Sequence, residues 1–190
     1  MFDKIKLLNK TASVSRWGGK HMLYPSNVLE HTARVQYITH LLLNEYSKYK
    51  RLDYKIAYDA MSYASEHDVL EALTNDIPYS IKKKYPKLKE ALQVVEESES
   101  IAYNLISPSE VSKTIVKLAD IVDVMYEAKR ELLFGNSQKD FVNIDTAVSN
   151  MITAISKTIG SIDSGDFDLI KLLDITKNLI SDISRTTSYD

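Results

Sequence analysis

Apolar residues recur at helical spacing along most of the chain. Phe2, Ile5 and Leu8 are each three residues apart, which puts them on one face of a helix. Similar apolar stripes, bounded by polar residues, glycine or proline, predict further helices. The predicted helical segments are residues 2–9, 27–46, 51–65, 86–104, 108–134, 141–159 and 167–183. Only five glycines and four prolines interrupt the chain, so the pattern predicts an all-α fold, a helical bundle of about six to eight helices.

Two of these helices begin with residues that cap helix N-termini. Asn27 is followed three residues later by Glu30, which is the spacing of a capping box. Pro108 and Ser109 mark the start of the longest helix, and Gly135 marks its end. These signals fix where the helices begin more sharply than the apolar pattern alone.

The length of 190 residues suits a single domain with a substantial core. Within residues 1–190 we expect a core formed by residues 1–135, accessory helices over residues 136–184 and a frayed tail at residues 185–190.

Charge and composition exclude several classes of protein. The net charge is -2 and the basic residues are scattered, so binding of a nucleic-acid polymer is not expected. No apolar run is long enough to span a bilayer, and the first residues lack the apolar core of a signal peptide. We therefore expect a cytoplasmic protein with no membrane partner. Without cysteine, metal ligands have to be histidines and carboxylates.

The segment from Ala64 to Pro78 concentrates side chains that bind metals and transfer protons. If it is helical up to about Thr74, then His67, Asp68 and Glu71 lie on one face. An imidazole beside a carboxylate suits a borderline divalent cation, but two ligands do not hold a metal tightly. A helix end with solvated polar groups is the alternative interpretation.

Further candidate ligands lie on two predicted helices. His31 falls on the apolar stripe of the segment 27–46, where a histidine is more often a core residue than a ligand. Asp120 and Asp123 lie within or beside the apolar stripe of the segment 108–134. Burying an unpaired carboxylate costs several kcal/mol, so either one would need a cation or hydrogen-bond donors. The edge of the buried stripe is the alternative place for both.

Two further segments carry residues that could contribute to a site. Arg16 and Trp17, beside two glycines, offer a guanidinium for phosphate and a flat ring for a base or sugar, although a core tryptophan with a surface arginine is equally compatible. Lys82 is the first of three consecutive lysines, which are typical of a solvated face. The acidic run 96–99 is expected on an outer face.

His31, then His67 and Asp68, then Asp120 occur in the order H…HD…D. In this the chain resembles the HD-domain phosphohydrolases, and within them the bacterial 5'-deoxynucleotidases and the phage-type dATP triphosphohydrolases. The resemblance covers about the first two thirds of the chain. It includes the further matches Arg16-Trp17, Asn27-Val-Leu-Glu-His31, Glu71, Thr74-Asn-Asp-Ile-Pro78 and Leu118-Ala-Asp120.

The chain departs from the family pattern at three places. Glu66 stands where the family usually has an aliphatic or aromatic residue, Val69 and Leu70 stand where it has small residues, and Asn75 replaces a glycine. These departures leave the ligand types intact but change the shape of the expected pocket.

The resemblance implies a metal centre formed by His31, His67, Asp68 and Asp120. The implied cofactor is a divalent cation such as Mn, Co, Mg, Zn or Fe, which lowers the pKa of a bound water and offsets charge on the phosphate. Glu71 is implied to be the general acid or base of the reaction.

The resemblance also implies a substrate site. In it Arg16 binds the phosphate, Trp17 forms a wall for the nucleoside, and Lys82 approaches the phosphate. Asp76 is implied to have a catalytic and substrate-binding role, holding water, a sugar hydroxyl or Arg16.

We therefore expect a metal-dependent phosphohydrolase that removes the 5'-phosphate from deoxyribonucleoside monophosphates. A dNTP triphosphohydrolase that releases tripolyphosphate is a second possibility, for which Lys82 and its two neighbours could supply positive charge. A third is a non-catalytic nucleotide-binding scaffold, which would not require Glu71. The expected partners are a deoxynucleotide substrate and further copies of the chain, because relatives form homo-oligomers.

Overall fold

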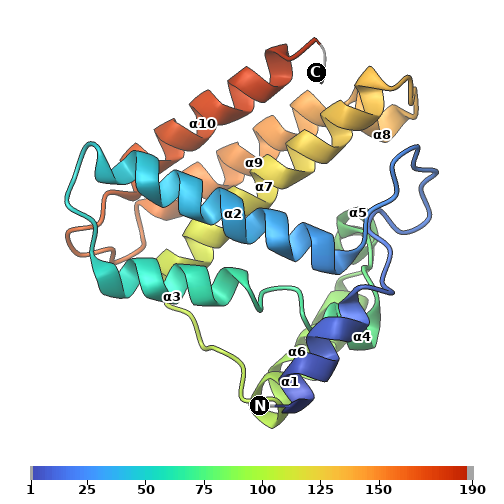
Figure 1. Ribbon diagram of the computed structural model, residues 1–190, viewed down its shortest axis with the longest axis horizontal. Coiled ribbons are helices and arrows are strands. Elements are labelled where there is room, and N and C mark those ends of the chain that lie inside the picture. Colours follow the sequence, from blue (N-terminus) through green and yellow to red (C-terminus); the bar gives the residue numbers. More distant parts are fainter. Residues whose placement is uncertain (1, 188–190) are drawn as a thin grey trace. The chain divides into compact units, whose positions relative to one another are not determined.

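A computed structural model describes residues 2–187 of the chain, and all of its named elements are helices (Figure 1). The helices are α1 (Phe2–Thr11), α2 (Val28–Ser47), α3 (Tyr54–Ala64), α4 (Glu71–Thr74), α5 (Tyr79–Lys84), α6 (Pro86–Ala102), α7 (Glu110–Leu133), α8 (Lys139–Val142), α9 (Ile144–Ile159) and α10 (Leu169–Arg185). Within the described residues, no helix combines the length and the apolar character needed to cross a membrane.

The predicted all-α class is confirmed, but the predicted number of about six to eight helices is too low. Three of the ten described helices have six residues or fewer, namely α4, α5 and α8. Such short helices carry too few apolar repeats to produce a helical pattern in the sequence.

The described residues form two compact units. The first contains residues 2–33 and 65–107, and the second contains residues 34–64 and 108–187. The expected single domain with a core and accessory helices stays a prediction. The end of the predicted tail, residues 188–190, lies outside the described residues.

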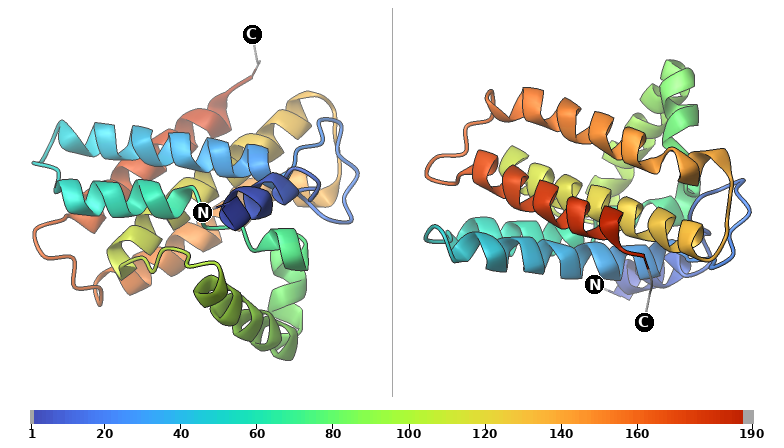
Figure 2. Two further views of the ribbon diagram at one scale, coloured as in Figure 1. Left: turned by 60° about the horizontal axis from the view of Figure 1, so that its bottom comes forward. Right: turned by 90° about the horizontal axis from the view of Figure 1, so that it is seen from above.

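Helix α7 is the centre of the second unit and contacts α3, α9 and α10 (Figures 1 and 2). Its predicted apolar stripe is confirmed, because Ile115, Leu118, Ala119, Val122 and Met125 are all buried. The helix begins as its sequence predicts, with the Ser109 hydroxyl accepting the N–H of Ser112 at 3.1 Å.

Two polar side chains of α7 are also fully buried in this unit. Asp123 and Glu127 have no exposed side-chain surface. Arg34, on α2, donates from Nε to Oδ1 of Asp123 at 2.6 Å and from Nη2 to Oε1 of Glu127 at 2.5 Å. A carboxylate buried on this stripe needs a cation or hydrogen-bond donors. At Asp123 the guanidinium of Arg34 supplies both.

A tyrosine anchors the start of α10 in the same unit. Tyr46 is fully buried and its ring stacks on that of Phe167, with centroids 4.4 Å apart. Its hydroxyl accepts the N–H of Asp168 at 2.8 Å, and Asp168 in turn caps α10. The aromatic pair therefore adds packing, and the hydroxyl supplies a partner for a backbone donor.

The first unit combines α1, α4, α5 and α6 with the first turn of α2. The capping box predicted at that turn is confirmed, because Asn27 Oδ1 accepts the N–H of Glu30 at 2.9 Å. The preceding loop is pinned by backbone bonds, from Arg16 N to Ser26 O and from Val28 N to Val14 O, each 2.9 Å. The first turn of α2 and the Arg16 segment are thereby held beside each other.

Candidate metal centre

The segment that carries His67 and Asp68 is a series of turns, so the continuous helix up to about Thr74, on which the shared face was conditional, is not present. Helix α3 ends at Ala64, and residues 65–70 form turns before the short α4. The N–H groups of Val69 and Glu71 bond to carbonyls three residues back, at 3.1 and 3.0 Å. Adjacent residues of a regular helix point about 100° apart. Tighter turns allow the side chains of His67 and Asp68 to converge instead.

The side chains of three predicted ligands converge in the first unit. The Nε2 atoms of His31 and His67 are 3.3 Å apart, and Oδ2 of Asp68 is 3.2 Å from the first and 3.4 Å from the second. Ligand atoms held about 2.0–2.1 Å from a tetrahedral zinc ion lie about 3.3 Å from one another. The three atoms thus have the spacing of one face of a coordination sphere.

The donor set also fits a cation chemically. His31 is fully buried, and its ring tilts against that of His67 with centroids 5.3 Å apart. Two imidazoles and a carboxylate suit borderline divalent metals. Burial by itself raises the pKa of Asp68, but the nearby His67, a hydrogen bond from His31 and the charge of Arg16 together hold it well below its usual range. Asp68 therefore presents a carboxylate.

Glu71, the predicted general acid or base, lies in the same unit at the start of α4. Its side chain is buried, and Oε2 has no hydrogen-bond partner among the described residues. Burial, followed by the negative charges of Asp68 and Asp76, raises the pKa of Glu71 to about 9. A carboxyl group with a raised pKa beside a candidate metal centre can hold a proton at neutral pH.

Asp76 connects the turn after α4 to the Arg16 segment. Its Oδ2 lies 3.5 Å from Nη1 of Arg16 and accepts the N–H of Trp17 at 3.2 Å. The same Nη1 lies 3.7 Å from Oδ2 of Asp68. Arg16, of which only 11% of the side chain is exposed, is therefore held between two carboxylates at the edge of the ligand triangle.

Strained backbone occurs on both sides of this connection. Trp17 has φ 58°, and Asn75 has φ 63° with ψ 164°. The conformation of Asn75 belongs to a region that is essentially restricted to glycine, which explains why the family pattern has glycine at this position. A second close approach occurs at Gly18, where an added Cβ would lie 3.0 Å from the carbonyl oxygen of Asp76.

The remaining two predicted site residues occupy different places. Lys82, on α5, is partly buried, whereas Lys83 and Lys84 are exposed, and its charge opposes the rise in the pKa of Glu71. Asp120 lies on α7 in the second unit, with Lys117 Nζ 2.6 Å from its Oδ2. Its place as a fourth ligand stays a prediction.

Two residues near this centre were not predicted from the sequence. Glu96 was expected on an outer face, yet it is half-buried, and burial and the charge of Asp68 raise its pKa against the effect of Lys82. Glu66 binds Lys4 Nζ at 2.9 Å. Its departure from the family pattern was the only signal for it in the sequence.

A family model described as YfbR-like 5'-deoxynucleotidase matches residues 4–162. The chain is also 25% identical to the 5'-deoxynucleotidase PM0747 of Pasteurella multocida (strain Pm70), over 150 residues that make up 69% of this chain and 75% of that protein. The resemblance to this family that the motifs indicated is therefore confirmed.

Solved structures share the fold. The cyanophage S-2L HD phosphohydrolase DatZ, described as bound to dA and one catalytic Zn²⁺ ion, has a TM-score of 0.66 at 20% identity, with 95% of this chain and 96% of that chain covered. The PH0347 protein of Pyrococcus horikoshii OT3 has a TM-score of 0.67 at 27% identity, with 95% and 99% covered. The predicted HD-type bundle is confirmed by these likenesses.

Proposed function

Because the chain belongs to the YfbR-like 5'-deoxynucleotidase family, we propose that it is a metal-dependent phosphohydrolase that removes the 5'-phosphate from deoxyribonucleoside monophosphates. The observation that carries this proposal is the triangle formed by His31, His67 and Asp68, whose ligand atoms lie 3.2–3.4 Å apart. A relative of this chain is named as a 5'-deoxynucleotidase.

The three residues of the triangle are proposed to hold a divalent cation, with Asp120 as the fourth ligand. Mn, Co, Mg, Zn and Fe all accept imidazole and carboxylate ligands to different degrees, and a related fold is described with one catalytic Zn²⁺ ion. When bound, the cation supplies a water of lowered pKa and offsets negative charge on the phosphate.

Arg16 is proposed to bind the phosphate of the substrate. Its guanidinium is held by Asp68 and Asp76 next to the ligand triangle, so a phosphate oxygen there would meet a pre-positioned donor. Lys82 adds positive charge close to Glu71. Trp17, whose backbone is fixed by Asp76, is proposed to form the wall against the nucleoside.

Glu71 is proposed to act as the general acid and then the general base of the reaction. Its carboxyl, protonated at neutral pH in the metal-free protein, can give its proton to the 5'-oxygen as the phosphorus–oxygen bond breaks. The attacking water forms the new bond to phosphorus and returns a proton to the carboxylate. The products are inorganic phosphate and a deoxynucleoside, and the carboxyl group ends the cycle as it began.

The test is product analysis with deoxynucleoside monophosphates, deoxynucleoside triphosphates and the matching ribonucleotides, each with Mg, Mn, Co or Zn. Wild type is compared with His67→Ala and Glu71→Gln. His40→Ala is the matched control, because His40 is an exposed histidine on α2 outside the candidate centre. We expect free phosphate from deoxynucleoside monophosphates, lost with His67→Ala, reduced roughly 10²–10⁴-fold with Glu71→Gln and unchanged with His40→Ala.

Other products would change the assignment. Tripolyphosphate together with a deoxynucleoside would identify a triphosphohydrolase. Nucleotide binding without any product, unaltered by Glu71→Gln, would identify a binding scaffold and contradict the proposal.

We further propose that the protein acts in the cytoplasm as a homo-oligomer, a dimer or larger. Large apolar side chains are exposed in the second unit, including Val142 at 57% and Ile170 at 64%. Exposed apolar surface of this kind suits contacts between copies. A solution mass equal to that of one chain would contradict the oligomer, and cell fractionation tests the location.

A further inference from the structure

Glu66, the residue directly before His67, binds two other segments of the first unit. Its Oε1 accepts from Nζ of Lys4, on α1, at 2.9 Å. Its Oε2 accepts from the backbone N–H of Ile106 at 2.9 Å. One side chain, 21% exposed, thus connects the turn that carries the candidate ligands to α1 and to the segment after α6.

The turn needs such support because regular structure does not fix it. Residues 65–70 lie between α3 and α4 and are held internally by bonds over three residues, without a continuous helical ladder. Ile106 also lies outside the helices, in the segment that follows α6. Its N–H therefore depends on a side-chain acceptor, and Glu66 supplies one.

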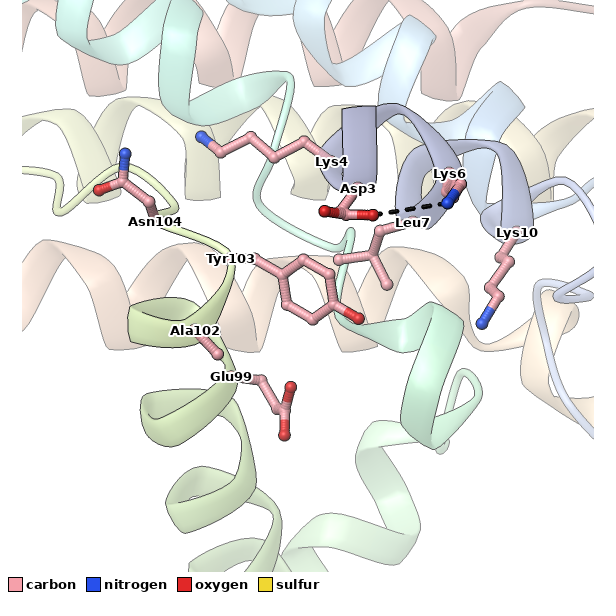
Figure 3. A pocket seen from close by; sticks show the side chains of 9 residues that line it. All are labelled: Asp3, Lys4, Lys6, Leu7, Lys10, Glu99, Ala102, Tyr103 and Asn104. Atoms are coloured by element: carbon pink, nitrogen blue, oxygen red, sulfur yellow. Dashed lines mark ion pairs between the residues drawn. The ribbon is translucent and has the colours of Figure 1, made fainter. Parts of the chain in front are cut away.

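A cavity of about 450 Å³ lies between α1 and the end of α6, lined by Lys4, Leu7, Tyr103 and Asn104 among others (Figure 3). In that view the Lys4 side chain extends from α1 toward the side of the cavity where Asn104 lies. The ion pair of Lys4 with Glu66 therefore adds a polar link between segments that this cavity partly separates.

We propose that Glu66 is a positioning residue for the metal centre. By holding the turn at both of its carboxylate oxygens, it keeps His67 where Nε2 faces His31 and Asp68. The inference rests on the proposed function, since it concerns the geometry of the proposed ligands. It also gives the departure of Glu66 from the family pattern a physical role, in which an ion pair and a backbone bond replace apolar packing.

The proposal is tested by the affinity for Zn²⁺ and Co²⁺, measured in competition with a chromogenic chelator, and by the visible spectrum of bound Co²⁺. We expect Glu66→Ala to weaken metal binding roughly 10–100-fold and to change the Co²⁺ spectrum. Lys4→Met should weaken it by a smaller factor. Glu66→Gln retains an acceptor for the N–H of Ile106 and should restore most of the affinity.

The matched control is Lys6→Met. Lys6 lies on the same helix and pairs with Asp3 at 3.6 Å, but both side chains are more than half exposed. This variant should bind metal as wild type does. A loss equal to that of Lys4→Met would show that any charge on α1 matters and would overturn the specific role of Glu66.

The outcomes separate this proposal from the metal site itself. If His67→Ala leaves metal affinity unchanged, the proposed ligands are wrong. If His67→Ala abolishes binding while Glu66→Ala only lowers the melting temperature, leaving affinity and spectrum intact, then Glu66 is structural and the positioning role is refuted. Should Glu66→Ala fail to fold, unchanged metal affinity and an unchanged Co²⁺ spectrum in Lys4→Met would refute it equally.

Discussion

Replacing Arg34 by methionine should destabilise the protein strongly, because it removes a guanidinium shared by two buried carboxylates. Asp123 and Glu127 have no exposed side-chain surface, and Arg34 donates to both, at 2.6 and 2.5 Å. Removing one partner of a buried ion pair costs about 3–5 kcal/mol. Arg34 itself is 25% exposed, so water can partly replace its charge, and the lower end of that range, about 3 kcal/mol, is expected.

The free energy of unfolding from urea denaturation measures this loss. The control is Lys113→Met in the same unit, whose pair with Glu110 has side chains 48% and 70% exposed. An exposed pair contributes at most about 1 kcal/mol, so this variant should remain close to wild type. Arg34→Met should also lower the melting temperature, by roughly 6–12 °C for a chain of this size.

A third variant separates loss of charge pairing from loss of packing. Combining Arg34→Met with Asp123→Leu and Glu127→Met removes these three charges together, and should recover part of the stability. A loss below about 1 kcal/mol in Arg34→Met would refute the reasoning, since it would mean that the two carboxylates are hydrated or neutral without Arg34.

Three further outcomes are expected. In metal-free protein, burial and then the charge of Asp68 raise the pKa of Glu71 from 4.5 to about 9, so between these values the folded state holds one more proton than the unfolded state. Wild-type stability should therefore fall by up to about 1.4 kcal/mol per pH unit as pH rises from about 5 to 9, and urea denaturation of Glu71→Gln in a chelator should lack that contribution. Tyr46→Phe should cost about 1 kcal/mol in the same assay, because the N–H of Asp168 loses its acceptor at 2.8 Å. Asn75→Gly should raise the melting temperature, since φ 63° with ψ 164° strains asparagine by about 1–3 kcal/mol; a lower melting temperature would contradict this.

The parts of the fold that could be predicted are those with local signals. Asn27 and Ser109 both cap the helices that their sequences indicate, because a cap depends on neighbours within three residues. The buried stripe of α7 follows from a helical period sustained over many turns. Local rules of this kind need no knowledge of the distant chain.

The parts that could not be predicted depend on distant partners. Arg34 and Asp123, which form an ion pair, are 89 positions apart in the sequence. The apolar pattern of neither helix indicates that these two residues meet. Glu96 was placed on an outer face because its neighbours are acidic, yet its burial is set by other segments of the first unit. The apolar stripe indicated that Asp123, if buried, would need a cation or hydrogen-bond donors, without indicating which residue supplies them.

The candidate site contains both features that the sequence predicted and features that it did not. The ligand types His31, His67 and Asp68 could be predicted, and the three atoms do converge. The condition of a helix through His67 and Asp68 was not met, because six residues carry too little apolar periodicity to distinguish a helix from a series of turns. The chemistry followed from residue identity, whereas the geometry followed from contacts that the sequence does not reveal.

Each candidate ligand of the first unit lies beside a polar contact that fixes its backbone. His31 is in the first turn of α2, whose start Asn27 caps, and His67 follows Glu66, whose carboxylate is bound at both oxygens. Arg16 is held by Asp76. A metal centre demands positions accurate to a fraction of an ångström, and turns alone do not provide this. We therefore infer that directional bonds to neighbouring residues set the positions of the candidate ligands. Substitutions of those neighbours should lower metal affinity at a smaller cost to the free energy of unfolding.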